Sequence, residues 1–290
     1  MLGLKRGTVK LYEHQKEWET EALNTICRLQ GILGTVIKDI QHVGSTSVPS
    51  IKAKPIIDIA VAVDDFGDIL SLEDKLKAYG FYYRPHANLK GQLLFACGSF
   101  YDGSGDLQTH FIHVVLTDSM EWKNYVNFRD YLNRTPSTAR EYENLKIALA
   151  EKSPVEGGRV KYTEGKHAFI AETLRKALVS SYLGKTVVIK IDRPVGYVHK
   201  TDNQSLTYPV NYGYVPGVLG GDGEELDVYL LGVDRPVYEY EGRIIAAVHR
   251  KDDIEDKLVM APLDMSFDKE EISAMVDFAE KYYDIEIEMP

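Results

Sequence analysis

The sequence contains few cysteines, no long apolar run and no excess of basic residues. Cys27 and Cys97 are the two cysteines among 290 residues, too few for a disulfide framework in a chain of this size. No apolar run approaches the roughly 20 residues that cross a bilayer, and the N-terminal residues lack the apolar core of a secretory signal. We therefore expect a cytoplasmic protein with no membrane partner.

Positive charge is scarce as well. Lys and Arg number 34 against 44 Asp and Glu, which gives a formal net charge of -10. Because affinity for a nucleic-acid backbone needs a basic face, we expect no nucleic-acid partner. An acidic protein can nevertheless bind a small phosphorylated molecule through a divalent cation held on carboxylates.

The chain is long enough for two domains, and its pattern changes near residue 182. Up to there, helical and strand patterns alternate. Beyond it, short β-rich runs separated by Gly, Pro and Asp turns are typical of an antiparallel barrel. We predict domains over 1–182 and 183–290, with helices near 14–33, 66–80, 120–133, 135–152 and 165–180, strands near 54–63, 92–100 and 109–116, and a terminal helix over 266–284 with Ser266 as its N-cap.

The stretch YPVNYGYVPGVLGGDGEELDVYLL (208–231) gathers four carboxylates within six residues: Asp222, Glu224, Glu225 and Asp227. Like charges this close repel each other, so a counter-ion is expected, and Mg²⁺ prefers oxygen ligands of this kind. A second acidic run at 252–256 follows the next predicted strand and could converge with the first. Taken alone, the first run is equally well explained as a solvated loop, and the second is better explained as one.

Convergent carboxylates suggest phosphoryl chemistry. Two Mg²⁺ ions about 3.5–4 Å apart could clamp a phosphoryl group and activate water. Lys200 and Lys257 could neutralise substrate phosphates, while Tyr208, Tyr212 and Tyr282 could donate hydroxyl groups to phosphate oxygens.

The composite motif YPVNYGYVPG…DGEELDVYLLG resembles that of the family I soluble inorganic pyrophosphatases, over about 184–288. The resemblance implies a five-stranded OB-type barrel that hydrolyses pyrophosphate to phosphate with Mg²⁺. It points to Asp227, Asp222 and Tyr212 as catalytic residues, and to Lys200, Lys257 and Tyr282 as phosphate contacts. The metal ligands that it implies are Asp222, Glu224, Asp227, Asp252 and, with the register left open, Glu255 or Asp256.

Several positions depart from that family. Val188 and Lys190 stand where the family has a Lys and a Glu, and Tyr283 stands where it has a Lys. Lys200 replaces an Arg and lacks the fork that binds phosphate with two hydrogen bonds. With phosphate-binding cations lost, a related diphosphate substrate is one alternative, and a non-catalytic nucleotide or diphosphate sensor is another.

The first half contains HVGSTSVPSIKAKPIIDIAVAV (42–63). The turn that opens at Gly44 presents backbone amides and the hydroxyls of Ser45 and Ser47, which could hold a phosphate. Asp58 lies within an apolar strand, where an ionised carboxylate is costly unless it is paired or bound to a metal. We predict Asp58 as a metal ligand, with a cap cluster and a buried structural acid as the alternative.

This stretch, with THFIHVV and YTEGKHAFIAETL, resembles the GrpB-like (UPF0157) family over about 8–178. That family resembles the nucleotidyltransferase superfamily, which implies an α+β domain that binds a nucleotide beside Mg²⁺. Ala60 replaces the second carboxylate of the expected pair, and His113 could substitute for it. Lys166 and Tyr162 could contact phosphate. A transferase releasing pyrophosphate for the barrel to hydrolyse would unite the halves, and a homo-oligomer is left open.

Overall fold

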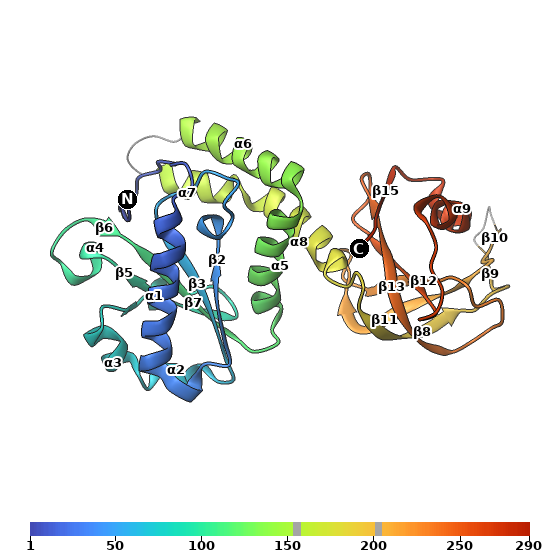
Figure 1. Cartoon of the computed structure of the whole chain (residues 1–290), viewed down its shortest axis with the longest axis horizontal. Helices are drawn as coiled ribbons and strands as arrows, with labels where there is room; N and C mark the ends of the chain where they lie inside the picture. The colour runs from blue at the N-terminus through green and yellow to red at the C-terminus, as the bar shows by residue number, and fades with distance from the viewer. Residues whose placement is uncertain (153–157, 201–204) are drawn as a thin grey trace. The chain divides into compact units, whose positions relative to one another are not determined.

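The computed structural model describes residues 1–152, 158–200 and 205–290 (Figure 1). It contains two compact units, Met1–Leu174 and Arg175–Pro290. The division falls inside helix α8 (His167–Ser180), upstream of the predicted boundary at 182/183. No helix within the described ranges is long and apolar enough to cross a membrane.

The first unit is built on a five-stranded mixed sheet with the order β2-β3-β7-β5-β4. Strands β3 and β7 run parallel, and the other neighbours run antiparallel. A separate ribbon pairs β1 with β6. The strands are β1 (Leu4–Lys5), β2 (Asp39–Val43), β3 (Ile57–Val63), β4 (Tyr82–Tyr83), β5 (Gln92–Cys97), β6 (Leu107–Gln108) and β7 (His110–Leu116).

Alternation along the strands decides which side chains face the core. In β3, Ile57, Ile59, Val61 and Val63 pack with helix α1 (Lys16–Leu33) in one apolar cluster. Asp58 therefore points to the opposite face of the sheet, because successive side chains of a strand alternate. The remaining helical segments are η1 (Gly34–Val36), η2 (Ser45–Ser47), η3 (Pro85–Ala87), α4 (Ser99–Asp102), α5 (Met120–Arg134), α6 (Pro136–Lys152) and α7 (Gly158–Glu164).

The single helix predicted over 66–80 is instead two, α2 (Phe66–Leu70) and α3 (Glu73–Ala78). Ser71 is the C-cap of the first, and its hydroxyl donates to the carbonyl of Asp68 at 2.7 Å. A local bond of this kind competes with the helical ladder.

The second unit is a closed five-stranded barrel with the order β8-β11-β12-β14-β13, in which β13 pairs back onto β8. This confirms the predicted OB-type barrel with one correction, since β12 and β14 run parallel while the other four pairings are antiparallel. The strands are β8 (Thr186–Arg193), β9 (Val198–Lys200), β10 (Ser205–Thr207), β11 (Asn211–Leu219), β12 (Glu225–Leu230), β13 (Glu239–Arg250), β14 (Lys257–Ala261) and β15 (Ile285–Glu288).

Helix α9 (Lys269–Glu280) covers the barrel with Ile272 and Val276, which pack in a cluster with barrel residues. Its N-cap is Asp268 and not the predicted Ser266. The Asp268 carboxylate accepts from the Glu271 amide at 2.8 Å, and the Glu271 carboxylate accepts from the Asp268 amide at 2.9 Å. In this reciprocal capping box a carboxylate takes the place of the serine hydroxyl that we predicted.

Candidate functional site

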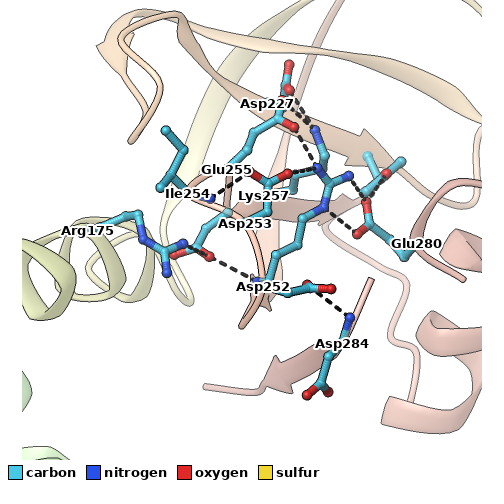
Figure 2. A network of polar contacts seen from close by, with 12 residues as sticks. Arg175, Asp227, Asp252, Asp253, Ile254, Glu255, Lys257, Glu280 and Asp284 are labelled. Carbon is cyan, nitrogen blue, oxygen red and sulfur yellow. Dashed lines mark hydrogen bonds and ion pairs between the residues drawn. The ribbon is translucent and has the colours of Figure 1, made fainter. Parts of the chain in front are cut away.

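Four predicted site residues meet around the ammonium group of Lys257 in the barrel (Figure 2). The Lys257 Nζ lies 2.7 Å from Asp227 Oδ2 and 2.9 Å from Glu255 Oε1, and it donates to the Tyr212 hydroxyl at 2.6 Å. Tyr212 comes from β11, Asp227 from β12 and Lys257 from β14, while Glu255 lies in the loop before β14. The Lys257 side chain is 4% exposed, so these contacts fix it in place.

A second buried cation, Arg250 at the end of β13, continues this network. Its Nε and Nη2 each lie 2.8 Å from an oxygen of Glu280, and its Nη1 lies 2.6 Å from Glu255 and 3.1 Å from Asp253. The guanidinium carbon is 3.6 Å from the ring centroid of Tyr283. Glu280 is fully buried, so its charge depends on this two-point contact.

The network remains short of positive charge. Asp227, Asp253, Glu255 and Glu280 supply four carboxylates against the two cations Lys257 and Arg250. When all six groups are ionised, the formal sum is two negative charges. One divalent cation would balance this sum.

The donor set fits a single Mg²⁺ ion. Solvent reaches Asp227 and Glu255, whose side chains are 23% and 30% exposed, and Mg²⁺ is commonly bound through one or two carboxylates together with water and phosphate. Within residues 1–152, 158–200 and 205–290, no group of three or more His, Cys, Asp or Glu side chains could hold a metal ion.

The tyrosines add hydroxyl groups beside the carboxylates. The Tyr208 and Tyr212 ring centroids are 5.3 Å apart. Burial, followed by the negative charge of Asp227, raises the pKa of Tyr212 well above its usual value, so its hydroxyl stays protonated and can donate.

Arg193 is a site residue that the sequence reading missed. It donates from Nη1 to the Tyr208 hydroxyl at 2.7 Å, and its guanidinium lies 5.1 Å from the Tyr212 ring centroid. The register between β8 and β11 shifts after Tyr212, which brings Arg193 opposite Tyr212. At Gly213 a Cβ would lie 1.8 Å from the Lys190 carbonyl oxygen, so glycine permits this approach. An irregular register of this kind cannot be read from strand alternation.

Five other predicted residues of the barrel lie on the surface. Asp222 and Glu224 are exposed in the turn before β12, where Asp222 accepts from the Glu224 amide at 3.0 Å. Glu225, the remaining carboxylate of that run, accepts from the Gly217 amide at 2.7 Å. Asp252 accepts from the Asp284 amide at 3.1 Å. Lys200 is exposed at the end of β9, and Tyr282 is 65% exposed, while its neighbour Tyr283 stacks on Arg250.

Asp256 lies apart from the Lys257 contacts. It is buried and accepts from Arg175, from the Arg250 amide at 3.1 Å and from His249 Nδ1 at 3.2 Å. Burial opposes a charge on His249, but hydrogen bonds to Asp256 and Glu288 raise its pKa. Adjacent side chains of an extended segment point to opposite sides, so Glu255, and not Asp256, faces Lys257.

The first unit has a cavity of about 520 Å³ that brings together most of its predicted site residues: Ser45, Asp58, His113, Tyr162 and Lys166 all line it. Asp58 Oδ1 lies 3.3 Å from His113 Nε2. Gly44 has φ of +71°, and a Cβ there would lie 2.6 Å from Asp58 Oδ2, so glycine is needed beside this carboxylate. Ser47 instead donates to the Gly44 carbonyl at 2.6 Å.

Comparison with known proteins agrees with this division. Residues 8–176 match the family model described as GrpB protein, so the chain belongs to that family. Residues 181–287 match the model described as inorganic pyrophosphatase. The chain is thus a fusion of the two kinds of domain, as the sequence predicts.

Individual proteins are similar to one part of the chain or the other. The glutamate-rich protein GrpB of Alkalihalophilus pseudofirmus is 38% identical over 177 residues, which is 61% of this chain and 99% of the relative. The crystal structure of GrpB from Enterococcus faecalis is 30% identical with a TM-score of 0.54, covering 60% of this chain and 99% of that one. The inorganic pyrophosphatase of Ehrlichia chaffeensis is 19% identical with a TM-score of 0.30, covering 37% of this chain and 87% of that one.

Proposed function

We propose that the barrel hydrolyses inorganic pyrophosphate, or a related small diphosphate, to phosphate with Mg²⁺. The observation that carries the proposal is the meeting of Asp227, Glu255, Tyr212 and Lys257 in one network. Asp227 and Glu255 can hold a divalent ion, and they lie beside the Lys257 ammonium group, which can bind a phosphate. The match of residues 181–287 to the pyrophosphatase family model supports the same chemistry.

The side chains divide the work. Asp227 and Glu255 would hold the ion. A Mg²⁺ ion bound there would neutralise charge on the diphosphate and would make a bound water molecule more acidic. Asp227 accepts a proton from the attacking water, while Lys257 and Arg193 stabilise the charge on the phosphate oxygens. Tyr212, kept protonated by its raised pKa, donates a hydrogen bond to a phosphate oxygen.

The test is phosphate release from pyrophosphate by the full chain in Mg²⁺. Wild type should release phosphate, and Asp227→Asn should lower the rate by at least about 100-fold, because it weakens the ion site and removes the proton acceptor. Asp277→Asn is the matched control, since it makes the same charge change at an exposed position of α9, and it should keep the wild-type rate.

A folded wild type that releases no phosphate from pyrophosphate or from other small diphosphates would refute hydrolysis. Binding of pyrophosphate without turnover would then favour the non-catalytic sensor. Equal losses in Asp227→Asn and Asp277→Asn would show that the network around Lys257 is not the active site.

A further inference from the structure

Arg175 contacts the acidic segments of the barrel from outside the residues that match the pyrophosphatase family model. It lies in α8, within the match to the GrpB model at 8–176 and before the second match begins at 181. It nevertheless belongs to the second unit. Its guanidinium donates to Asp256 Oδ1, and its side chain is 12% exposed (Figure 2). The helix before the barrel therefore supplies a half-buried cation to the loop that precedes β14.

Arg175 also lies against the other acidic segment, the turn before β12. A Cβ at Gly221 would lie 2.7 Å from Arg175 Cδ and 2.2 Å from the Ile254 carbonyl oxygen, so only glycine lets the turn approach this closely. Asp222 follows Gly221 in the turn, and Glu255 follows Ile254 in the loop. Arg175 thus lies where the two acidic segments of the barrel meet.

The Asp256 side chain is 1% exposed, so its carboxylate depends on buried donors. Its Oδ1 accepts from Arg175 and from the Arg250 amide at 3.1 Å, and its Oδ2 lies 3.2 Å from His249 Nδ1. His249 is shared with Glu288, which lies 2.9 Å from its Nε2, whereas the Arg175 guanidinium is always charged. Without this guanidinium, a buried negative charge loses its strongest partner, and the carboxylate gains by turning toward water.

We infer that Arg175 is a positioning residue of the site around Lys257. By holding Asp256 on one side of the loop, Arg175 directs the adjacent Glu255 to the other side, since neighbouring side chains of an extended segment point in opposite directions. There Glu255 lies 2.9 Å from Lys257. The effect on hydrolysis rests on the proposed function of the barrel, whereas the effect on the loop does not.

Hydrogen exchange of the full chain without Mg²⁺ tests the loop by itself. In Arg175→Met the Arg250 amide should exchange at least about tenfold faster than in wild type, because its acceptor Asp256 moves away. The β12 amides should keep their wild-type rates, which shows that the barrel is folded. Arg235→Met is the matched control, because it removes the same charge at an exposed position of the second unit, and it should change no rate. An unchanged Arg250 amide, or an equal loss of protection throughout β12, would overturn the inference.

Titration calorimetry with Mg²⁺ tests the position of Glu255. Removing a cation from an acidic region should by itself tighten Mg²⁺ binding, because less positive charge repels the ion. A misplaced Glu255 has the opposite effect, so we expect Arg175→Met to weaken Mg²⁺ binding by about tenfold. Unchanged or tighter binding would refute the positioning role.

Arg175→Lys keeps a cation near Asp256 and guards against a variant that simply folds poorly. Its Mg²⁺ affinity should stay within about threefold of that of wild type, because the charge that holds the carboxylate is retained. Equal weakening in Arg175→Lys and Arg175→Met would show a general packing effect and overturn the inference.

Phosphate release separates this inference from the proposed function. If the barrel hydrolyses pyrophosphate, Arg175→Met should need about tenfold more Mg²⁺ to reach half of its maximal rate, while its rate at saturating Mg²⁺ should stay within about threefold of wild type. Asp227→Asn should remain slow at every Mg²⁺ concentration. A wild type that releases no phosphate would refute the hydrolysis, and the exchange and calorimetry would still decide on Arg175. A wild-type Mg²⁺ requirement in Arg175→Met would refute the positioning role and leave the hydrolysis standing.

Discussion

The two units hold their acidic groups in opposite ways. In the barrel, Asp227 and Glu255 share Lys257, and Glu255 also contacts Arg250. In the first unit, Asp58 contacts an imidazole and faces a cavity. A carboxylate already paired with a buried cation is positioned before any ligand arrives, but the ligand must compete with that cation. A carboxylate on the wall of a cavity is left to interact with a ligand directly.

The largest effect that would sharpen this contrast is expected at Arg250. Arg250→Met leaves Glu280, which is 0% exposed, buried without its guanidinium partner, and breaking a buried pair in this way costs about 3–5 kcal/mol. Hydrogen exchange of β13 and β14 amides at increasing denaturant concentration measures the loss. Lys251→Met should cost at most about 1 kcal/mol, because Lys251 forms an exposed contact with Asp284 at 3.8 Å. Similar losses in both variants would show that burial of the pair is unimportant.

Arg250 is paired with carboxylates, whereas the buried Lys146 of the first unit donates to a backbone carbonyl, that of Lys52. Burial lowers its pKa to about 7, whereas an unfolded lysine keeps its proton up to about pH 10. Between these values the unfolded state binds more protons, so stability rises with pH and is lost as the pH falls toward 7. The rise should be at most about 1.4 kcal/mol per pH unit.

The measurement is urea unfolding at pH 7, 8 and 9, followed by the fluorescence of Trp18 and Trp122. The free energy of unfolding of wild type minus that of Lys146→Met should increase with pH, because the variant lacks the titrating amine. Lys152→Met, an exposed position at the end of α6, should follow the wild type. A constant difference between wild type and Lys146→Met would contradict the lowered pKa.

Lys257→Gln tests whether the internal cation competes with the proposed ion. Removing a positive charge 2.7 Å from Asp227 and 2.9 Å from Glu255 should tighten Mg²⁺ binding by about tenfold, or about 1.4 kcal/mol. Phosphate release should fall by at least about tenfold, because the phosphate loses its cation. Titration calorimetry with Mg²⁺ and a phosphate assay measure the two effects. An unchanged Mg²⁺ affinity would place the ion away from Lys257.

The smallest expected effect is the loss of barrel stability when one of two adjacent tyrosines is replaced. Tyr283→Leu removes the ring 3.6 Å from the Arg250 guanidinium and should lower the free energy of unfolding of the barrel by about 1 kcal/mol. Tyr282→Leu changes a side chain that is 65% exposed and should stay within about 0.5 kcal/mol. Hydrogen exchange of the barrel amides compares them. A larger loss for Tyr282→Leu would reverse the assignment of the ring contact.

Sequence reading was most informative where a regular pattern determines side-chain direction. The apolar run at 54–63 predicted the strand that carries Asp58, and the composite motif singled out Tyr212 and Asp227, which both contact Lys257. Alternation also separates Glu255 from Asp256, but only once the first residue of β14 is known. The motif could not show that Asn211 is buried and donates to the carbonyls of Val233 and Arg235 at 2.7 and 3.0 Å.

Two other features depend on contacts distant in sequence. Arg250 lies within the run HRKDDIEDK, which looks like a solvated loop until Glu280, thirty residues later, folds against it. Arg193 reaches Tyr208 because the β8–β11 register shifts. The balance between carboxylates and internal cations in the barrel therefore follows from tertiary structure.

The pairing of β13 has a consequence for synthesis of the chain. This strand pairs with β8, β14 and β15, so the barrel cannot close until β14 at Lys257–Ala261 has left the ribosome. The first unit is complete by Leu174. The partners of β8 are β11 and β13, so at about 5–20 residues per second its second edge stays unpaired for roughly 3–11 s, until β13 is complete at Arg250. During that interval the nascent chain exposes β-rich segments that other strands could capture, which makes this part of the molecule the one most in need of a chaperone.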